Sequence, residues 1–224
     1  KRDLQKIIAE FDLPMPEIRV TILGLCLDET IKPTYPRALP KALDEGFVLS
    51  VGTLEPRKNY GMLYEIWRAL YQRHADIYKP LVIVGNTGWR SETLENQLSN
   101  NYLLHKNPII RLSKVDDAEL TWLYQNCRLT IYPSFYEGWG LPVSESLLHG
   151  KYCITSNTSS LPEAGLGCCS HFDPIDGEGF LKEIVKSLSD DTYLQSREQK
   201  IAASVTSRSW QDSGREFFAG IAGL

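Results

Sequence analysis

Short apolar runs alternate with amphipathic segments through most of the chain, and this alternation constrains its fold more than any other feature. The runs are almost continuously apolar, which is typical of strands buried on both faces of a parallel sheet. Between them, apolar residues recur at helical spacing. The sequence therefore predicts an α/β fold, a parallel sheet with helices on both faces. The predicted strands are 47–51, 81–84, 109–112, 129–132 and 152–155; the predicted helices are one that follows Asn59, then 91–104, 116–126 and 142–149.

Turn and cap residues mark the ends of these predicted strands and the starts of the helices. Gly52, Gly85 and Pro133 each follow a predicted strand, so we expect them at the edge where open α/β sheets bind ligands. Asn59 stands where a helix cap is expected. Asp116 and Glu119 have the spacing of a capping box.

The ends of the chain look different from this core. A short helix is predicted at residues 1–11, a strand at 18–23 and a proline-spaced linker at 32–40. We interpret residues 1–40 as the end of a preceding domain with its linker, 41–206 as the main domain and 207–224 as a C-terminal helix. The tail from residue 177 is predicted to be helical, with a packing stripe formed by Trp210, Phe217, Phe218 and Ile221.

Composition excludes several classes of protein. The formal net charge is −4 in 224 residues, so there is no electrostatic footprint for nucleic acid. No apolar run approaches the roughly 18 residues of a membrane span, and no signal peptide is visible. The five cysteines lack zinc-type spacing, and an odd count without a disulfide framework favours a reducing, cytoplasmic compartment. A redox role for adjacent Cys168 and Cys169 is the alternative to burial as small apolar residues.

Residues 133–150 carry the most chemical information. Glu137 lies in a glycine-containing loop, and Glu145 follows eight positions later, about one turn into the predicted helix. Backbone amides at a strand–loop–helix corner converge, and the helix dipole favours an anion there. Carboxylates beside an anion site are unexpected unless they face neutral groups such as sugar hydroxyls. The combination suggests a nucleotide-sugar pocket.

A second informative segment, residues 51–59, follows the first core strand. Arg57 and Lys58 are adjacent at the entrance of a helix, where cations are poorly placed for the helix dipole and gain from a polyanion. The alternative is a solvated loop with two ordinary surface cations.

Together these segments resemble the retaining glycosyltransferases of family 4 (glycosyl transferases group 1), whose GT-B architecture has two Rossmann-like domains facing across a cleft. The resemblance covers residues 45–215 and implies that the predicted sheet is the C-terminal, donor-binding half of such an enzyme. Its landmarks occur in order: 51–59, 82–85, 110–120 with Tyr124, 133–142 with Glu145, 156–163, 173–174 and 209–210.

The resemblance also implies roles for individual residues. Glu145 is expected to bind the ribose hydroxyls, because a carboxylate accepts two hydrogen bonds from a vicinal diol. Glu137 is expected to contact the donor sugar. Arg57 and Lys58 are expected to neutralise the departing diphosphate, so Glu137, Lys58 and Arg57 are the predicted catalytic residues.

The remaining predicted donor contacts are mostly backbone groups. The N–H groups of Gly138, Trp139, Gly140 and Leu141 are expected to hold the sugar and diphosphate, with the Trp139 side chain packing beneath the loop. Further predicted contacts of the donor, including its base, are Gly52, Thr53, Gly85, Lys114 and Val115. Each glutamate also has a structural interpretation: Glu137 caps the following helix, and Glu145 is a solvated helix residue.

One position departs from the family pattern. Many members carry arginine where this chain has Thr53, and here the cation stands at Arg57 instead. The variant Gly-Thr-Leu-Glu-Pro-Arg-Lys-Asn resembles bacterial polysaccharide enzymes, frequently mannosyltransferases that use GDP-mannose.

The resemblance therefore implies transfer of a hexose, mannose in the first instance, from a nucleotide-diphosphate sugar with retention, without a metal or other cofactor. The implied acceptor is a saccharide or lipid-linked saccharide, bound through an N-terminal domain outside this chain, in the cytoplasm or at the inner membrane face. The isolated chain is then expected to bind nucleotide but to be inactive. The alternatives are a non-catalytic nucleotide-sugar-binding module or scaffold and, less favoured, an epimerase or a phosphorylase; a phosphorylase needs a pyridoxal lysine, for which no candidate is visible.

Overall fold

The structure, a computed structural model, describes residues 2–18, 26, 28, 30–40, 43, 46–99, 109–207 and 209–222. The chain divides into two compact units, one formed by residues 1–27 with 207–224 and the other by residues 28–206. The first unit contains α1 (Arg2–Glu10) and α9 (Trp210–Ala222), which confirms helices near both ends. The predicted strand 18–23 lies, apart from its first residue, outside the described residues.

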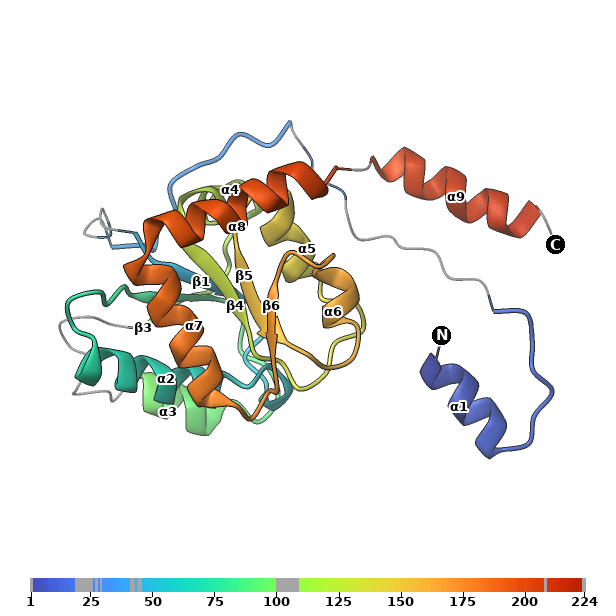
Figure 1. Cartoon of the computed structure of the whole chain (residues 1–224), viewed down its shortest axis with the longest axis horizontal. Helices are drawn as coiled ribbons and strands as arrows, with labels where there is room; N and C mark the ends of the chain where they lie inside the picture. Colours follow the sequence, from blue (N-terminus) through green and yellow to red (C-terminus); the bar gives the residue numbers. More distant parts are fainter. Residues whose placement is uncertain are drawn as a thin grey trace. The chain divides into compact units, whose positions relative to one another are not determined.

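The second unit is built on a six-stranded parallel sheet with the order β3-β2-β1-β4-β5-β6 (Figure 1). Its first five strands match the predicted runs to within one residue at either end. The sixth was not predicted, because it has only three, half-buried residues. The strands are β1 (Val48–Val51), β2 (Leu81–Val84), β3 (Ile109–Leu112), β4 (Leu129–Tyr132), β5 (Cys153–Ser156) and β6 (Ser170–Phe172).

Helices connect these strands and cover the sheet. The capping box at the start of α4 is present: the Asp116 side chain accepts from the Glu119 N–H, and the Glu119 carboxylate accepts from the Asp116 N–H. The predicted helix 91–104 is described only over α3, and residues 100–108 are not described. The helical elements are η1 (Pro56–Lys58), α2 (Tyr60–Arg73), α3 (Glu92–Ser99), α4 (Asp117–Asn126), α5 (Leu141–Leu148), α6 (Leu161–Ala164), α7 (Gly177–Ser189) and α8 (Asp191–Ser204).

The sheet is covered on both faces, as predicted. Alternate residues of β1 enter different apolar clusters: Val48 joins the cluster that contains Trp67 of α2 and Phe180 of α7, whereas Leu49 joins the cluster that contains Leu123 of α4. This two-sided burial explains why the strands are continuously apolar rather than alternating. The fold is Rossmann-like, as the sequence predicts.

Residues 34–39, which we expected within a linker, pack against α4. The Thr34 N–H donates to the carbonyl oxygen of Ala118, the Tyr35 ring meets Trp122 edge-on with centroids 4.7 Å apart, and Leu39 is buried. Arg37 forms ion pairs with Asp116 and Glu119. This segment is therefore part of the packed surface of the second unit.

Two further findings bear on the sequence analysis. Cys168 and Cys169 are buried, in keeping with small apolar core residues. Among the elements whose placement is described, none is a helix of the length and apolarity that a membrane crossing requires.

Candidate functional site

The loops that follow β1 and β4 meet at one edge of the sheet because these strands are parallel neighbours. The Phe135 N–H donates to the carbonyl oxygen of Arg57 at 2.8 Å, which joins the two loops directly. Topology thus brings together residues 52–59 and 133–141, the two segments that the sequence singled out.

Asn59 helps to hold this junction, but not as a cap. It occupies the position before α2 with φ 58° and makes no side-chain cap hydrogen bond. Its amide instead donates to the carbonyl oxygens of Pro133 and Pro174, at 3.1 and 2.7 Å. Asn59 therefore stands at the predicted start of α2, but its side chain does not cap the helix and instead bonds the loops that follow β4 and β6.

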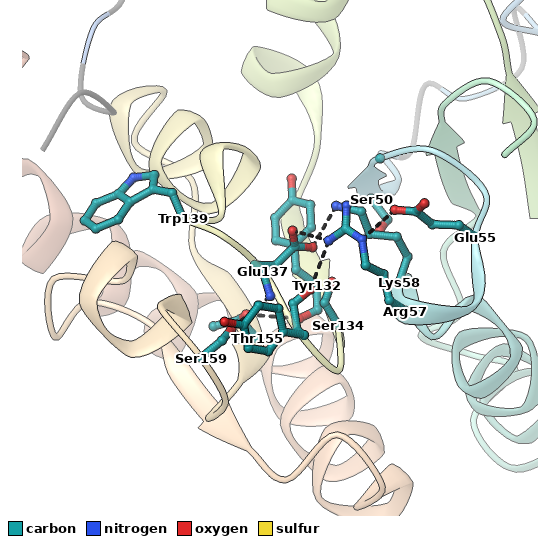
Figure 2. A network of polar contacts seen from close by, with 12 residues as sticks. Ser50, Glu55, Arg57, Lys58, Tyr132, Ser134, Glu137, Trp139, Thr155 and Ser159 are labelled. Carbon is teal, nitrogen blue, oxygen red and sulfur yellow. Dashed lines mark hydrogen bonds and ion pairs between the residues drawn. The ribbon is translucent and has the colours of Figure 1, made fainter. Parts of the chain in front are cut away.

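A compact ion cluster lies at the centre of the site (Figure 2). Arg57 Nη1 lies 2.6 Å from Glu137 Oε2, and Lys58 Nζ lies 2.7 Å from Glu137 Oε1. Arg57 Nε lies 2.7 Å from Glu55 Oε1. Burial by itself raises the pKa of Glu137, but the hydrogen bonds from Lys58 and Arg57 outweigh burial and hold that pKa below its ordinary value. Glu137 is therefore a buried carboxylate that is stable in its charged form.

The cluster brings the three predicted catalytic residues into direct contact. The sequence analysis assigned the cations to a diphosphate and Glu137 to sugar hydroxyls, whereas here both carboxylate oxygens of Glu137 accept from the cations. A polyanion that approaches Arg57 and Lys58 competes with Glu137 for them. The carboxylate released by such an exchange has free acceptor oxygens for hydroxyl groups.

A hollow of about 210 Å³ lies at the same edge and is lined by the other predicted donor contacts, Gly52, Thr53, Gly85, Lys114 and Val115. The glycine at position 85 is required by close packing, because a Cβ atom there collides with the carbonyl oxygen of Gly52. Thr53 contributes no charge, which leaves Lys114 as the only cation among the residues that line this hollow.

The loop from Gly138 to Leu141 presents backbone donors. Within the described parts of the chain, the N–H groups of these four residues donate to no protein acceptor. The loop is held from behind by Ser160, whose hydroxyl donates to the carbonyl oxygens of Glu137 and Trp139. Backbone donors without a protein acceptor, in the loop that leads into the N-terminus of α5, favour an anion.

Trp139 belongs to the support of this loop. Its indole N–H donates to Ser144 Oγ at 3.1 Å and its ring packs against the core, so the side chain points away from the ion cluster (Figure 2). Gly140 has φ 98°, and a Cβ atom there lies 2.8 Å from Leu161 Cδ2. Both contacts fix the path of the backbone into α5.

Glu145 has a different environment from Glu137. Its Oε2 accepts from the buried Tyr124 hydroxyl at 2.8 Å, and no cation pairs with it among the described residues. Burial raises the pKa of Glu145, an effect that the Tyr124 hydrogen bond only partly offsets. His149 stacks on Tyr124 with ring centroids 5.1 Å apart, so it supports this pair as a packing residue.

Sequence reasoning missed three residues that organise the site: Glu55, Tyr124 as the partner of Glu145, and Ser159, whose hydroxyl accepts from the Glu137 N–H at 2.9 Å. Glu55 stands two positions before Arg57, and this spacing was the available signal. Tyr124 and Ser159 reach the site from elsewhere in the sequence, and only the fold brings them there. Within the described residues, no three His, Cys, Asp or Glu side chains gather in a metal-binding arrangement.

Comparison with known families places this site in context. Residues 31–198 match the profile of glycosyl transferases group 1. The chain belongs to this family. The matched range contains every residue of the ion cluster, the hollow and the loop before α5.

One relative is the O-antigen chain mannosyltransferase B of Escherichia coli. It is 31% identical to this chain over 212 residues, which cover 92% of this chain and 55% of the relative. The serotype-specific mannosyltransferase WbdA of Escherichia coli is 29% identical over 77% of this chain and 21% of the relative. The chain thus spans about half the length of the first and about a fifth of the second.

Solved structures agree on the fold. TarM superposes with a TM-score of 0.71 at 12% identity, covering 97% of this chain and 41% of that protein. A trehalose-6-phosphate synthase superposes with a TM-score of 0.70 at 14% identity, over 84% of this chain and 48% of that protein. At such identities these neighbours establish the fold alone.

Proposed function

We propose that this chain is the donor-binding part of a retaining, metal-independent hexosyltransferase of polysaccharide biosynthesis. The donor is a nucleotide-diphosphate sugar, GDP-mannose in the first instance, and the acceptor is a saccharide or lipid-linked saccharide. The predicted Rossmann-like domain, residues 41–206, binds the donor, and the enzyme works in the cytoplasm or at the inner face of the membrane.

One observation supports this proposal most directly: two cations, a buried carboxylate and free backbone donors meet at one edge of the sheet. Arg57 and Lys58 contact Glu137, and the N–H groups of Gly138 to Leu141 come from the same loop. In a sugar diphosphate, the diphosphate is an anion that suits the cations and the backbone N–H groups. The sugar carries hydroxyls that suit a carboxylate.

In the proposed mechanism, the diphosphate replaces Glu137 as the partner of the two cations. Arg57 and Lys58 then neutralise charge that develops on the diphosphate as its bond to the sugar breaks, and the loop N–H groups add further stabilisation. The released Glu137 carboxylate accepts from hydroxyls of the sugar. The acceptor attacks the face from which the diphosphate leaves, which gives retention.

The hollow lined by Gly52, Thr53, Gly85, Lys114 and Val115 receives the rest of the nucleotide. Glu145 binds the ribose diol through the carboxylate oxygen that Tyr124 does not occupy. The mannose assignment has two supports: the Gly-Thr-Leu-Glu-Pro-Arg-Lys-Asn loop, and the similarity to proteins described as mannosyltransferases.

Transfer needs acceptor contacts that we assign to a second domain outside this chain. The chain alone is then expected to bind a nucleoside diphosphate without transferring sugar, and efficient transfer by the isolated chain would overturn this assignment.

A thermal-shift panel of UDP, GDP, UDP-glucose and GDP-mannose tests the donor assignment, because a ligand that binds the folded state raises the melting temperature by mass action. We expect the guanosine ligands to stabilise the chain more than the uridine ligands. No shift with any of the four would contradict donor binding. Binding by the full-length protein without transfer to any saccharide acceptor would favour a non-catalytic module.

A further inference from the structure

Three residues with exposed aromatic side chains contact residues of the ion cluster, and the proposed donor site uses none of these side chains. Trp89 is 55% exposed, Phe135 44% and Tyr136 58%. The Trp89 indole N–H donates to Glu55 Oε2 at 3.0 Å, and Glu55 pairs with Arg57 through its other oxygen. The Phe135 N–H donates to the Arg57 carbonyl oxygen, and Arg57 Nη1 donates to the Tyr136 carbonyl oxygen at 2.9 Å.

The loop that carries Trp89 is held firmly. The Leu54 N–H donates to the Asn86 carbonyl oxygen and the Gly88 N–H donates to the Leu54 carbonyl oxygen, both at 2.9 Å. A Cβ atom at Gly88 lies 2.6 Å from the same Leu54 oxygen, so the two loops are in close contact. The Trp89 N–H is bonded to Glu55, while more than half of the side chain is exposed to solvent.

Polar groups surround this ring. The Arg90 guanidinium carbon lies 5.5 Å from its centroid. A hollow of about 240 Å³ beside it is lined in part by Glu55, Asn59, Arg90 and Ser91. An exposed aromatic face next to donors and acceptors suits a ligand with one apolar face and a polar edge. A pyranose has both, because its C–H groups form a face and its hydroxyls form the rim.

We propose that Trp89, Glu55 and Arg90 form a saccharide subsite beside the donor pocket, which takes a hexose of the acceptor. This inference rests on the proposed function. Trp89 stacks on the sugar face, while Arg90 bonds to its hydroxyls. The chain of contacts Trp89–Glu55–Arg57–Glu137 places the subsite next to the cations that hold the diphosphate, where an acceptor must reach the donor sugar.

Nuclear magnetic resonance offers a direct test, since each indole N–H gives a separate resonance. The probe is an α-linked mannobiose, added to the chain with and without GDP. We expect the Trp89 resonance, assigned from a Trp89→Phe variant, to shift in a saturable manner. Trp210, which is exposed in the other unit, is the internal control and should not shift. Trp89→Ala should weaken mannobiose binding by about tenfold or more, and Trp210→Ala should not.

The outcomes separate this inference from the proposed function. If GDP stabilises the chain but mannobiose leaves the Trp89 resonance unchanged, the subsite is wrong and donor binding stands. If mannobiose shifts Trp89 while no nucleotide binds, the subsite stands and the donor assignment fails. Equal mannobiose affinity in the Trp89→Ala variant would overturn the inference; should that variant fail to fold, equal affinity in Trp89→Leu, which removes the aromatic face but keeps an apolar side chain, would overturn it.

Discussion

The two carboxylates of the site differ in what surrounds them. Glu137, on the loop side, contacts two cations and has a lowered pKa, whereas Glu145, on the helix side, contacts a neutral phenol and has a raised pKa. Identical side chains eight positions apart therefore have opposite electrostatic environments. Glu137 must exchange its partners when a polyanion binds. Glu145 keeps Tyr124 as its partner and has one oxygen left for a ligand.

The contrast between the two carboxylates predicts the largest loss of nucleotide affinity for a substitution at Lys58. Lys58→Ala should weaken GDP binding by about 3 kcal/mol, since a charge-assisted contact with the diphosphate is lost. GMP affinity should change much less. Calorimetry with both nucleotides measures this difference, with the exposed Lys182→Ala as the matched control. Equal losses for GMP and GDP would show that Lys58 does not contact the second phosphate.

The helix side should respond differently. Glu145→Ala should weaken nucleotide binding by roughly 1–3 kcal/mol through lost ribose hydrogen bonds. The loss should be the same for GMP and GDP, because both contain the ribose. The exposed Glu163→Ala serves as the control in the same titration. A loss confined to GDP would move Glu145 to the diphosphate and remove the contrast between the two acids.

Tyr124→Phe changes the environment of Glu145 and leaves that of Glu137 unchanged. The variant loses the hydroxyl that fixes Glu145 Oε2 and should weaken nucleotide binding by about 1 kcal/mol. Because the phenol hydrogen bond lowers the pKa of Glu145, its removal should also move the pH dependence of binding upward. Tyr64→Phe, a half-buried tyrosine on α2, is the control. An unchanged pH profile would mean that Tyr124 only fills space.

The smallest effects concern stability as a function of pH. The pKa of Glu137 is lowered from its ordinary value of 4.5, so its contribution to the free energy of unfolding is present above pH 4.5 and is lost as pH falls through the folded-state pKa. The pKa of Glu145 is raised from 4.5, so the folded state retains a proton that the unfolded state releases, and stability falls as pH rises through that interval.

Denaturant titrations across this pH range check the direction in which each carboxylate makes stability depend on pH. Glu137→Gln should remove part of the loss of stability in acid, and Glu145→Gln should remove part of the decline above pH 4.5. If the two variants changed the pH profile in the same direction, the two environments would not be opposite.

Much of the fold followed from patterns within short segments. The apolar runs predicted five strands, and the Asp116–Glu119 spacing predicted the start of α4, because strand burial and helix capping depend on neighbouring residues. The exceptions have identifiable causes. β6 is too short to produce a pattern, and Asn59 has a left-handed backbone that directs its amide toward Pro133 and Pro174.

The sequence by itself determined the parallel α/β architecture, and it predicted the edge where the candidate site lies and the charged residues of the ion cluster other than Glu55. Only the tertiary structure decided how these residues pair. The contacts of Glu137 with Arg57 and Lys58, of Glu145 with Tyr124 and of Trp89 with Glu55 join residues distant in the chain. The physical reason is that periodicity and capping are set by near neighbours, whereas a carboxylate takes its partner, and hence its pKa, from whichever loops the strand order brings to the same edge.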